Sequence, residues 1–122
     1  MAKIKVSEAS GKVLDWLVAK CEGYRATIER DEIVYTHPSG EWHHNGNWSP
    51  STKWVQGGPI IDREGISWHC GNKTSWHAYA YGDNDNITGP TSLIAAMRCY
   101  VTSKLGDEVE VSKLAKRLVL LS

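Results

Sequence analysis

Residues 49–64 bring together glycines, prolines, one indole ring and two cationic side chains. Gly57 and Gly58 precede Pro59, and glycine leaves the main-chain N–H groups open to the close approach of a ligand. Such N–H groups can form a nest for an anion, with a nearby cation neutralising a phosphate. The segment therefore predicts an exposed loop that binds an anionic ligand. Its predicted ligand contacts are Ser51, Thr52, Lys53, Trp54, Gln56, Gly57, Gly58 and Arg63.

The same segment has a second interpretation. Pro50 and Pro59 can make a loop rigid, with Trp54 packed beneath it as a core residue. Glycine and proline serve both uses, so the sequence leaves both interpretations open. A Walker-type phosphate loop is excluded, because the segment lacks the Gly-Lys-Ser/Thr ending of that motif.

His77, Tyr79 and Tyr81 are spaced two residues apart, so they share one face if residues 75–81 form a strand. These rings, with Trp48, could stack a base and hydrogen-bond a ribose or phosphate. Stacking of a base on an aromatic ring contributes about 1–3 kcal/mol. The alternative is a solvent-facing strand whose tyrosines pair with side chains on the neighbouring strands.

A metal site receives little support from the histidines. His43 and His44 are adjacent, and His69 is adjacent to Cys70. Neighbouring residues of a strand point to opposite faces, so neither pair can chelate one ion on a regular backbone. No H-E-x-x-H or C-x-x-C pattern accompanies them. We therefore expect neither a metal nor another cofactor.

The candidate nucleophiles and carboxylates are equally unsupportive of catalysis. Cys21, Cys70 and Cys99 are odd in number and far apart, which predicts free thiols. Neither Cys70 nor Cys99 stands in a glycine-flanked elbow that would activate it. Asp83 and Asp85 belong to a turn cluster, where bonding to the backbone accounts for them. We predict no catalytic residue, and a metal-assisted hydrolase is the third functional alternative.

The charge balance argues against nucleic acid as a partner. The 122 residues include 14 Lys and Arg and 14 Asp and Glu, so no net field attracts nucleic acid or anionic lipid. This length suits one domain, which we place over residues 1–122. No apolar run reaches signal-peptide or membrane-spanning length, which predicts a cytoplasmic protein without a membrane partner.

Apolar periodicity predicts an α+β fold. Two main helices are expected, one ending near residue 22 after a cap at Ser7 or Ser10, the other over residues 91–105. Strands are expected at 3–6, 24–30, 32–37, 66–70 and 75–81, with residues 42–48 as a loop or irregular strand. The predicted architecture is a small, mostly antiparallel sheet of about four to five strands, with both helices on one face.

Residues 111–122 have two predicted states. Leu114, Leu118 and Leu121 could line a short C-terminal helix that packs on the domain or on a second copy. Otherwise these residues form a flexible tail.

Three segments together resemble the phage NinX family. They are Lys-Val-Leu-Asp-Trp-Leu-Val-Ala-Lys-Cys within residues 11–23, Ser-Pro-Ser-Thr with Gln-Gly-Gly-Pro-Ile-Ile within 49–61, and Gly-Pro-Thr-Ser-Leu-Ile-Ala-Ala-Met-Arg-Cys-Tyr at the start of 89–111. The resemblance covers most of the chain between Val6 and Val111. It implies a small accessory protein of lambdoid and related phages, and it implies no mechanism.

Phage accessory proteins of this size are often carried to disarm host defences, which is an argument from context. We predict a non-enzymatic module, active in the host cytoplasm, that binds a small phosphorylated or nucleotide-like ligand. A pocket in so small a domain can lie at a junction between copies, so a homo-oligomer is one expected arrangement. The alternative is an interaction module that inhibits a host protein through its tryptophans, since Trp, Tyr and Arg dominate interface energetics.

Overall fold

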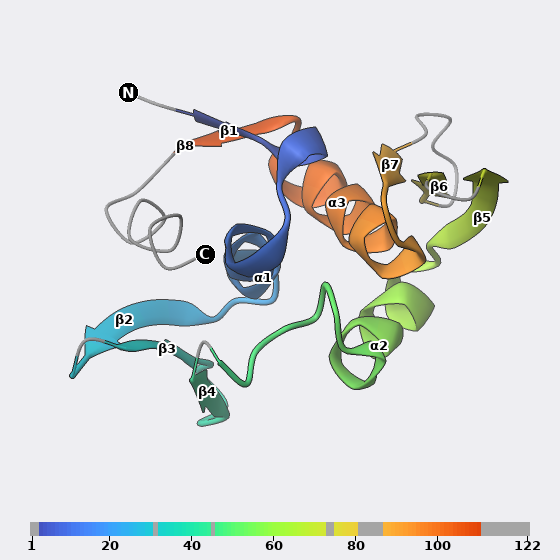
Figure 1. The fold of residues 1–122 in the computed structure, drawn as a ribbon. Coiled ribbons are helices and arrows are strands. Elements are labelled where there is room, and N and C mark those ends of the chain that lie inside the picture. Colours follow the sequence, from blue (N-terminus) through green and yellow to red (C-terminus); the bar gives the residue numbers. More distant parts are fainter. Residues whose placement is uncertain (1–2, 31, 45, 73–74, 81–86, 111–122) are drawn as a thin grey trace.

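The computed structural model describes residues 3–30, 32–44, 46–72, 75–80 and 87–110. Strands and helices alternate irregularly along these residues (Figure 1). Their order is β1 (Lys3–Lys5), the 3-10 helix η1 (Val6–Glu8), α1 (Gly11–Cys21), β2 (Arg25–Glu29), β3 (Glu32–Thr36), β4 (Trp42–His44), α2 (Trp54–Glu64), β5 (Ser67–Asn72), β6 (Ser75–Tyr79), β7 (Ile87–Gly89), α3 (Ser92–Leu105) and β8 (Glu108–Glu110).

Helix α3 forms the centre of the core. The Thr91 hydroxyl accepts a hydrogen bond from the Ile94 N–H at 3.1 Å, which caps the first turn. Gly106 ends the helix with φ at +88°, a conformation that favours glycine. Figure 1 shows α3 crossing the molecule, with α1 on one side and the β5–β6–β7 sheet on the other. The middle of the helix, residues 95–101, is buried, whereas Ser103 and Lys104 are exposed. Its buried apolar residues are Leu93, Ala95, Ala96, Met97, Cys99, Tyr100 and Val101.

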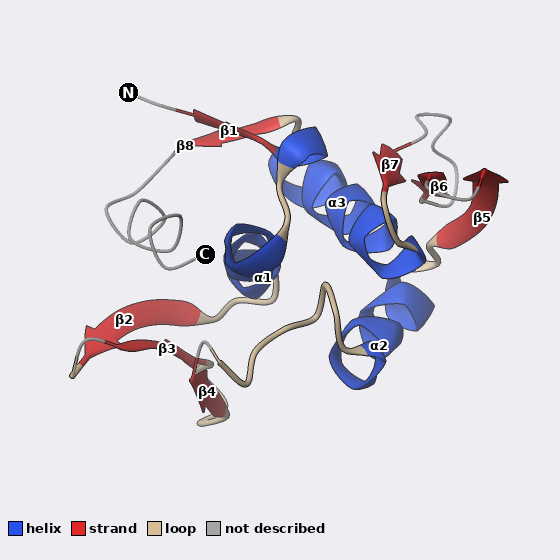
Figure 2. Cartoon of the chain, in the orientation of Figure 1, coloured by secondary structure: helices blue, strands red, loops and turns tan. Residues whose placement is uncertain are grey.

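The predicted α+β class is confirmed. Among the described residues, the strands form three small antiparallel sheets, ordered β1-β8, β2-β3-β4 and β5-β6-β7. The strands thus do not join in one sheet. The β2–β3–β4 sheet packs beside α1 and the β5–β6–β7 sheet packs on α3, so these two helices lie between them (Figure 2). The predicted hairpins are present: β2 pairs with β3, and β5 pairs with β6.

An open loop was predicted over residues 49–64, but residues 54–64 form a helix, so the prediction is wrong for them. Helix α2 begins at Trp54 and contains Gly57, Gly58 and Pro59, three residues of low helix propensity. Tertiary packing compensates for that propensity, since Ile60 and Ile61 are buried in the core. Gly65 closes the helix with φ at +65°.

Gly57 is the position where α2 comes closest to the rest of the protein. A Cβ at Gly57 would lie 2.5 Å from the Pro50 carbonyl oxygen and 2.6 Å from Leu93 Cδ1. Pro50 is itself fully buried. The helix therefore packs against α3 and against its own preceding segment at a distance that only glycine permits.

The segment before α2, residues 46–53, is here called the linker, and Asp15 of α1 fixes its position. Trp48 Nε1 donates to the Asp15 backbone carbonyl at 2.8 Å, and the Ser51 backbone N–H donates to Asp15 Oδ1 at 2.9 Å. Asp15, Trp48 and Ser51 are all buried. One helical residue thus orients both the indole and the backbone of the linker.

Burial raises the pKa of the Asp15 carboxyl, while hydrogen bonding from Ser51 and the charges of Lys12 and Lys53 act to lower it. The Ser51 hydroxyl lies near that carboxylate without meeting hydrogen-bond geometry. The net direction is upward, so the folded state binds a proton at this site more tightly than the unfolded chain does.

The two glycines of α2 give a matched pair of variants. We expect Gly57→Ala to lower the free energy of unfolding by about 1–3 kcal/mol through overpacking against Pro50 and Leu93. We expect Gly58→Ala to change it less, because beyond its chain neighbours the new Cβ meets Trp54 Cε3 at 3.9 Å, and the gain in helix propensity opposes crowding against the ring of Pro59. Urea denaturation of both variants measures the difference. Equal effects would contradict the packing of Gly57.

Asp15→Asn tests the buried carboxyl through its pH dependence. A folded-state pKa raised above the unfolded value means that Asp15 costs stability progressively as pH rises through that interval. Asparagine keeps an oxygen for the Ser51 N–H and carries no charge. The stability of the variant relative to the parent should therefore increase from acidic to neutral pH, as measured by denaturation at several pH values. A difference that does not change with pH would refute the assignment.

Candidate functional site

Two exposed tryptophans from different elements contact each other at the surface. Trp54 begins α2 and is 48% exposed, and Trp68 of β5 is 40% exposed. Their ring centroids lie 5.6 Å apart, with the planes tilted by 46°. Val55, the next residue of α2, is 81% exposed. We call Trp54, Val55 and Trp68 the indole surface.

The position of each tryptophan follows from its element. Helix α2 buries the side that contains Gly57, Ile60 and Ile61, which leaves its first turn outside the core. Trp68 pairs with Ala78 of β6, which is buried. The two residues share the sheet face that packs on α3. Trp68 stands on the edge strand, however, where its ring lies beside α2.

Strand β5 is an edge strand in the described part of the chain, because β6 is its only strand neighbour there. Residues Ser67–Asn72 are all exposed and include neither a charged residue nor proline. Native proteins usually protect such an edge with charge, proline or a covering element. This edge, adjacent to Trp68, has none of these among the described residues.

Several polar residues in the linker and the first turn of α2 were predicted to contact a ligand, and some of them serve the fold. Ser51 is buried. Gln56 accepts from the Ser49 N–H at 2.6 Å and donates to the Asn47 carbonyl at 2.7 Å, so both ends of its amide brace the linker. Thr52 and Lys53 are exposed, and Thr52 Oγ1 donates to the Ser49 carbonyl at 3.4 Å.

The predicted anion nest is wrong, because its amides lie inside a helix. The Gly57 N–H donates to the Lys53 carbonyl at 2.9 Å. The Gly58 N–H lies within α2, where amides donate to the carbonyl four residues earlier. Neither group is open to an anion. Gly57 serves close packing, and the ring of Trp54 stays at the surface.

Arg63 is engaged by carboxylates of the protein itself. Its guanidinium donates to both oxygens of Glu22, at 3.0 and 2.5 Å, and to Glu64 at 2.8 Å. The Tyr100 hydroxyl also donates to Glu22. These carboxylates raise the pKa of Arg63. The cluster ties α1 to α2 and α3, so Arg63 acts as a structural cation and lies apart from the indole surface.

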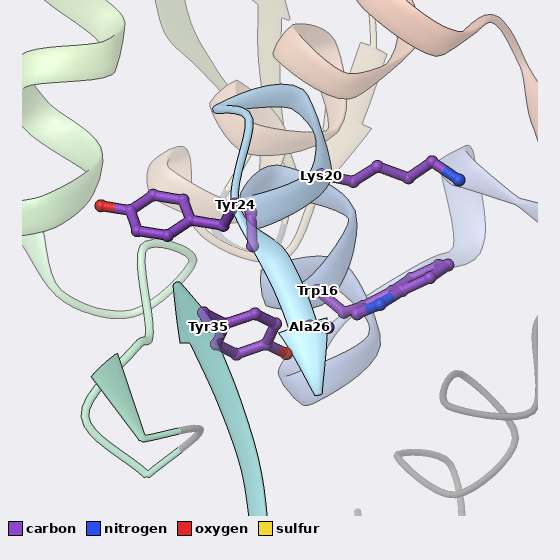
Figure 3. Close-up of a pocket in the computed structure, with 6 residues that line it drawn as sticks. Trp16, Lys20, Tyr24, Ala26 and Tyr35 are labelled. Atoms are coloured by element: carbon purple, nitrogen blue, oxygen red, sulfur yellow. The ribbon is translucent and has the colours of Figure 1, made fainter. Parts of the chain in front are cut away.

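Trp48 is a core residue. It is only 5% exposed, and its ring lies 4.9 Å from Tyr24 and 5.2 Å from His43. Next to this cluster, a cavity of about 200 Å³ lies between α1 and the β2–β3 hairpin (Figure 3). No predicted site residue lines it; its walls are Trp16, Ala19, Lys20, Tyr24, Ala26 and Tyr35. A cavity of this size is smaller than the 300–1,000 Å³ usual for small-molecule sites.

His77 and Tyr79 share a face of the β5–β6–β7 sheet, as the alternation predicted. The buried Ala78 between them faces the core. His77 is stacked on His69 of β5, with centroids 5.1 Å apart and planes 7° apart, and Tyr79 is 38% exposed. This face is opposite to the face of Trp68 and Ala78. Tyr81, and the turn cluster with Asp83 and Asp85, lie outside the described residues, as do residues 111–122.

The structure therefore separates the predicted site into several places. Lys53 and Trp54 are adjacent on the surface, and Thr52 is exposed beside them. The other described members are apart: Trp48, Ser51 and Gly57 are buried, Gln56 and Arg63 bond within the protein, and His77 and Tyr79 lie on the other sheet face. Sequence reasoning missed Val55 and Trp68. The available signals were a valine directly after the tryptophan of the predicted loop and a tryptophan on an uncharged strand.

Two cysteines and two histidines have structural environments within the protein. Burial raises the pKa of Cys21 to about 12, which keeps that thiol protonated, and Cys99 is buried. His43 and His44 contact different carboxylates, Glu41 and Glu32, each at 2.9 Å. Within the ranges that the structure describes, no three His, Cys, Asp or Glu side chains gather in a way that could hold a metal ion.

Each helix of the described residues is too short or too polar to cross a bilayer. No curated protein matches this chain. A family model described as Bacteriophage P22, NinX matches residues 5–104, which is well over half of the sequence. The matched region contains the first two segments on which the resemblance was based, and the third segment as far as residue 104. The chain therefore belongs to the phage NinX family.

Proposed function

We propose that this phage accessory protein is a non-enzymatic module that acts in the host cytoplasm by docking on a host protein. The observation that carries the proposal is the indole surface, where two exposed tryptophans contact each other beside an almost fully exposed valine. Contiguous exposed apolar patches mark interaction sites, whereas singly exposed apolar residues are normal on a protein surface. Tryptophan also ranks among the residues that contribute most to binding energy.

The helix and the strand that carry the two rings make the indole surface rigid. Trp54 belongs to a helix whose other side is buried, and Trp68 belongs to a strand paired with β6. Groups held on regular elements lose little conformational entropy when a partner covers them. A partner that covered both rings would also remove a large apolar area from water, which is the principal favourable term in association.

The edge of β5 at Ser67–Cys70 supplies a second component of recognition. Its N–H and C=O groups can pair with an extended segment of a partner, while Trp68 of the same strand contacts a side chain of that segment. Main-chain pairing supplies affinity, and the indole surface supplies specificity. Both lie on the same side of the molecule, since Trp68 belongs to both.

A small phosphorylated or nucleotide-like ligand is the second candidate. It is favoured by one observation, the exposed ring of Trp54 with the exposed cation of Lys53 adjacent in the chain. A base could stack on Trp54 while Lys53 contacts a phosphate. Calorimetric titration with cyclic oligonucleotides and ADP-ribose derivatives tests this candidate. Saturable heat that Trp54→Ala abolishes would support it, and no heat from the folded protein would refute it.

Val55→Glu is the sharpest test of protein docking. The position is 81% exposed and helical, so glutamate should fold normally and place a charge in the proposed interface. We expect recovery of the host partner from lysate to fall at least about tenfold, or about 1.4 kcal/mol. Ser7→Glu, an exposed position on η1, is the matched control and should retain the partner. Quantitative mass spectrometry of captured proteins makes the comparison.

Trp54→Ala and Trp68→Ala complete that experiment. Each should lose the partner at a smaller cost to the free energy of unfolding than a buried tryptophan would show, because nearly half of each side chain is already exposed. Trp48→Ala should instead cost about 3–5 kcal/mol, because that ring is buried. A partner retained by folded Val55→Glu and both tryptophan variants would overturn the proposal.

A further inference from the structure

The outer face of the β2–β3–β4 sheet has a groove with aromatic and acidic side chains. The strand register places Thr36 opposite Trp42, Val34 opposite His44, and Glu29 opposite Glu32. Because residues alternate between sheet faces, these six side chains share one face. Five of them line a groove of about 290 Å³: Glu29, Val34, Thr36, Trp42 and His44.

The indole of Trp42 forms the exposed wall of this groove. It is 58% exposed, more than any other tryptophan in the described part of the chain, although its strand lies in a paired sheet. His44 meets it in an edge-to-face contact, with centroids 5.2 Å apart and planes at 81°. His44 Nδ1 in turn lies 2.9 Å from Glu32 Oε2. The histidine thus links the ring to the acidic end of the groove.

Two carboxylates face each other at that end. Glu29 and Glu32 are direct cross-strand neighbours, an arrangement that destabilises a sheet by like-charge repulsion. Glu32 has His44 beside it, whereas the carboxylate of Glu29 makes no hydrogen bond or ion pair with another described residue. Arg25 is on the same face, opposite Thr36, and makes no ring contact with Trp42. The groove therefore has a negative end that the described residues leave only partly compensated.

We propose that this groove binds an arginine side chain of a partner protein. A planar guanidinium can stack on the Trp42 ring while its N–H fork donates to Glu29, a combination that lysine provides less well. The volume of about 290 Å³ is at the lower limit for small-molecule sites, and it suits one side chain presented by a surface. This site goes beyond the indole surface and is separate from it, because the sheet packs beside α1, whereas α2 and β5 pack beside α3 (Figure 1).

The test uses the chemistry of the bound group. A capped Gly-Gly-Arg-Gly-Gly peptide is titrated into the ¹⁵N-labelled protein, and the indole N–H signal of Trp42 is followed by NMR. The signal is assigned with Trp42→Phe. We expect a saturable shift that the same peptide with citrulline, a neutral isostere of arginine, does not produce. A lysine peptide should bind at least threefold more weakly.

The matched variants are Glu29→Gln and Glu41→Gln. Both residues are exposed on this sheet, and Glu41 contacts His43 on the other face. Glu29→Gln should weaken binding of the arginine peptide at least threefold, and Glu41→Gln should leave it unchanged. The remaining backbone signals of each variant report whether the fold is intact. An equal shift with citrulline, an absent shift, or binding unaffected by Glu29→Gln would overturn the proposal.

Discussion

The position of the candidate site depends on how Asp15 holds the chain that leads into α2. Its backbone carbonyl accepts the Trp48 indole N–H, and its carboxylate accepts the Ser51 amide. These bonds fix the linker against α1 from within the core, and α2 begins three residues after Ser51. If the linker were free, Trp54 would have no defined place beside Trp68. Burial of the Asp15 carboxylate carries a desolvation cost, and its hydrogen bonds fix the position at which α2 begins.

One side of helix α2 packs in the core, and its first turn is exposed. Gly57, Ile60 and Ile61 pack inward, and the closeness of Gly57 to Pro50 and Leu93 brings the helix against α3. The ion pairs of Arg63 with Glu22 and Glu64 tie its last turn to α1 and to its own neighbour. With both ends held, the exposed first turn keeps its two apolar side chains in one arrangement. Such preorganisation is what a protein-binding surface requires.

Apolar spacing in the sequence predicted the helices and strands that are regular along their length. The stripe containing Leu14, Leu17 and Val18 identified α1, and alternation around Ala78 identified the two faces of β6. The α2 prediction failed because Gly-Gly-Pro normally ends regular structure. Here the close approach of Gly57 to Pro50 and Leu93, which no local pattern signals, makes a glycine necessary inside the helix. The roles of Trp48 and Arg63 were likewise set by Asp15 and Glu22, 33 and 41 residues away. The pairing of Trp54 with Trp68 requires the same tertiary information.

The central claim is that the indole surface contacts a host protein inside the infected cell. Photo-cross-linking tests it most directly, with benzoylphenylalanine in place of Val55 and, separately, of Ser7, in protein expressed in host cells. The account predicts one dominant host-protein adduct from position 55 that is absent from position 7 and disappears when unmodified protein competes. No adduct from position 55, or the same adducts from both positions, would contradict it.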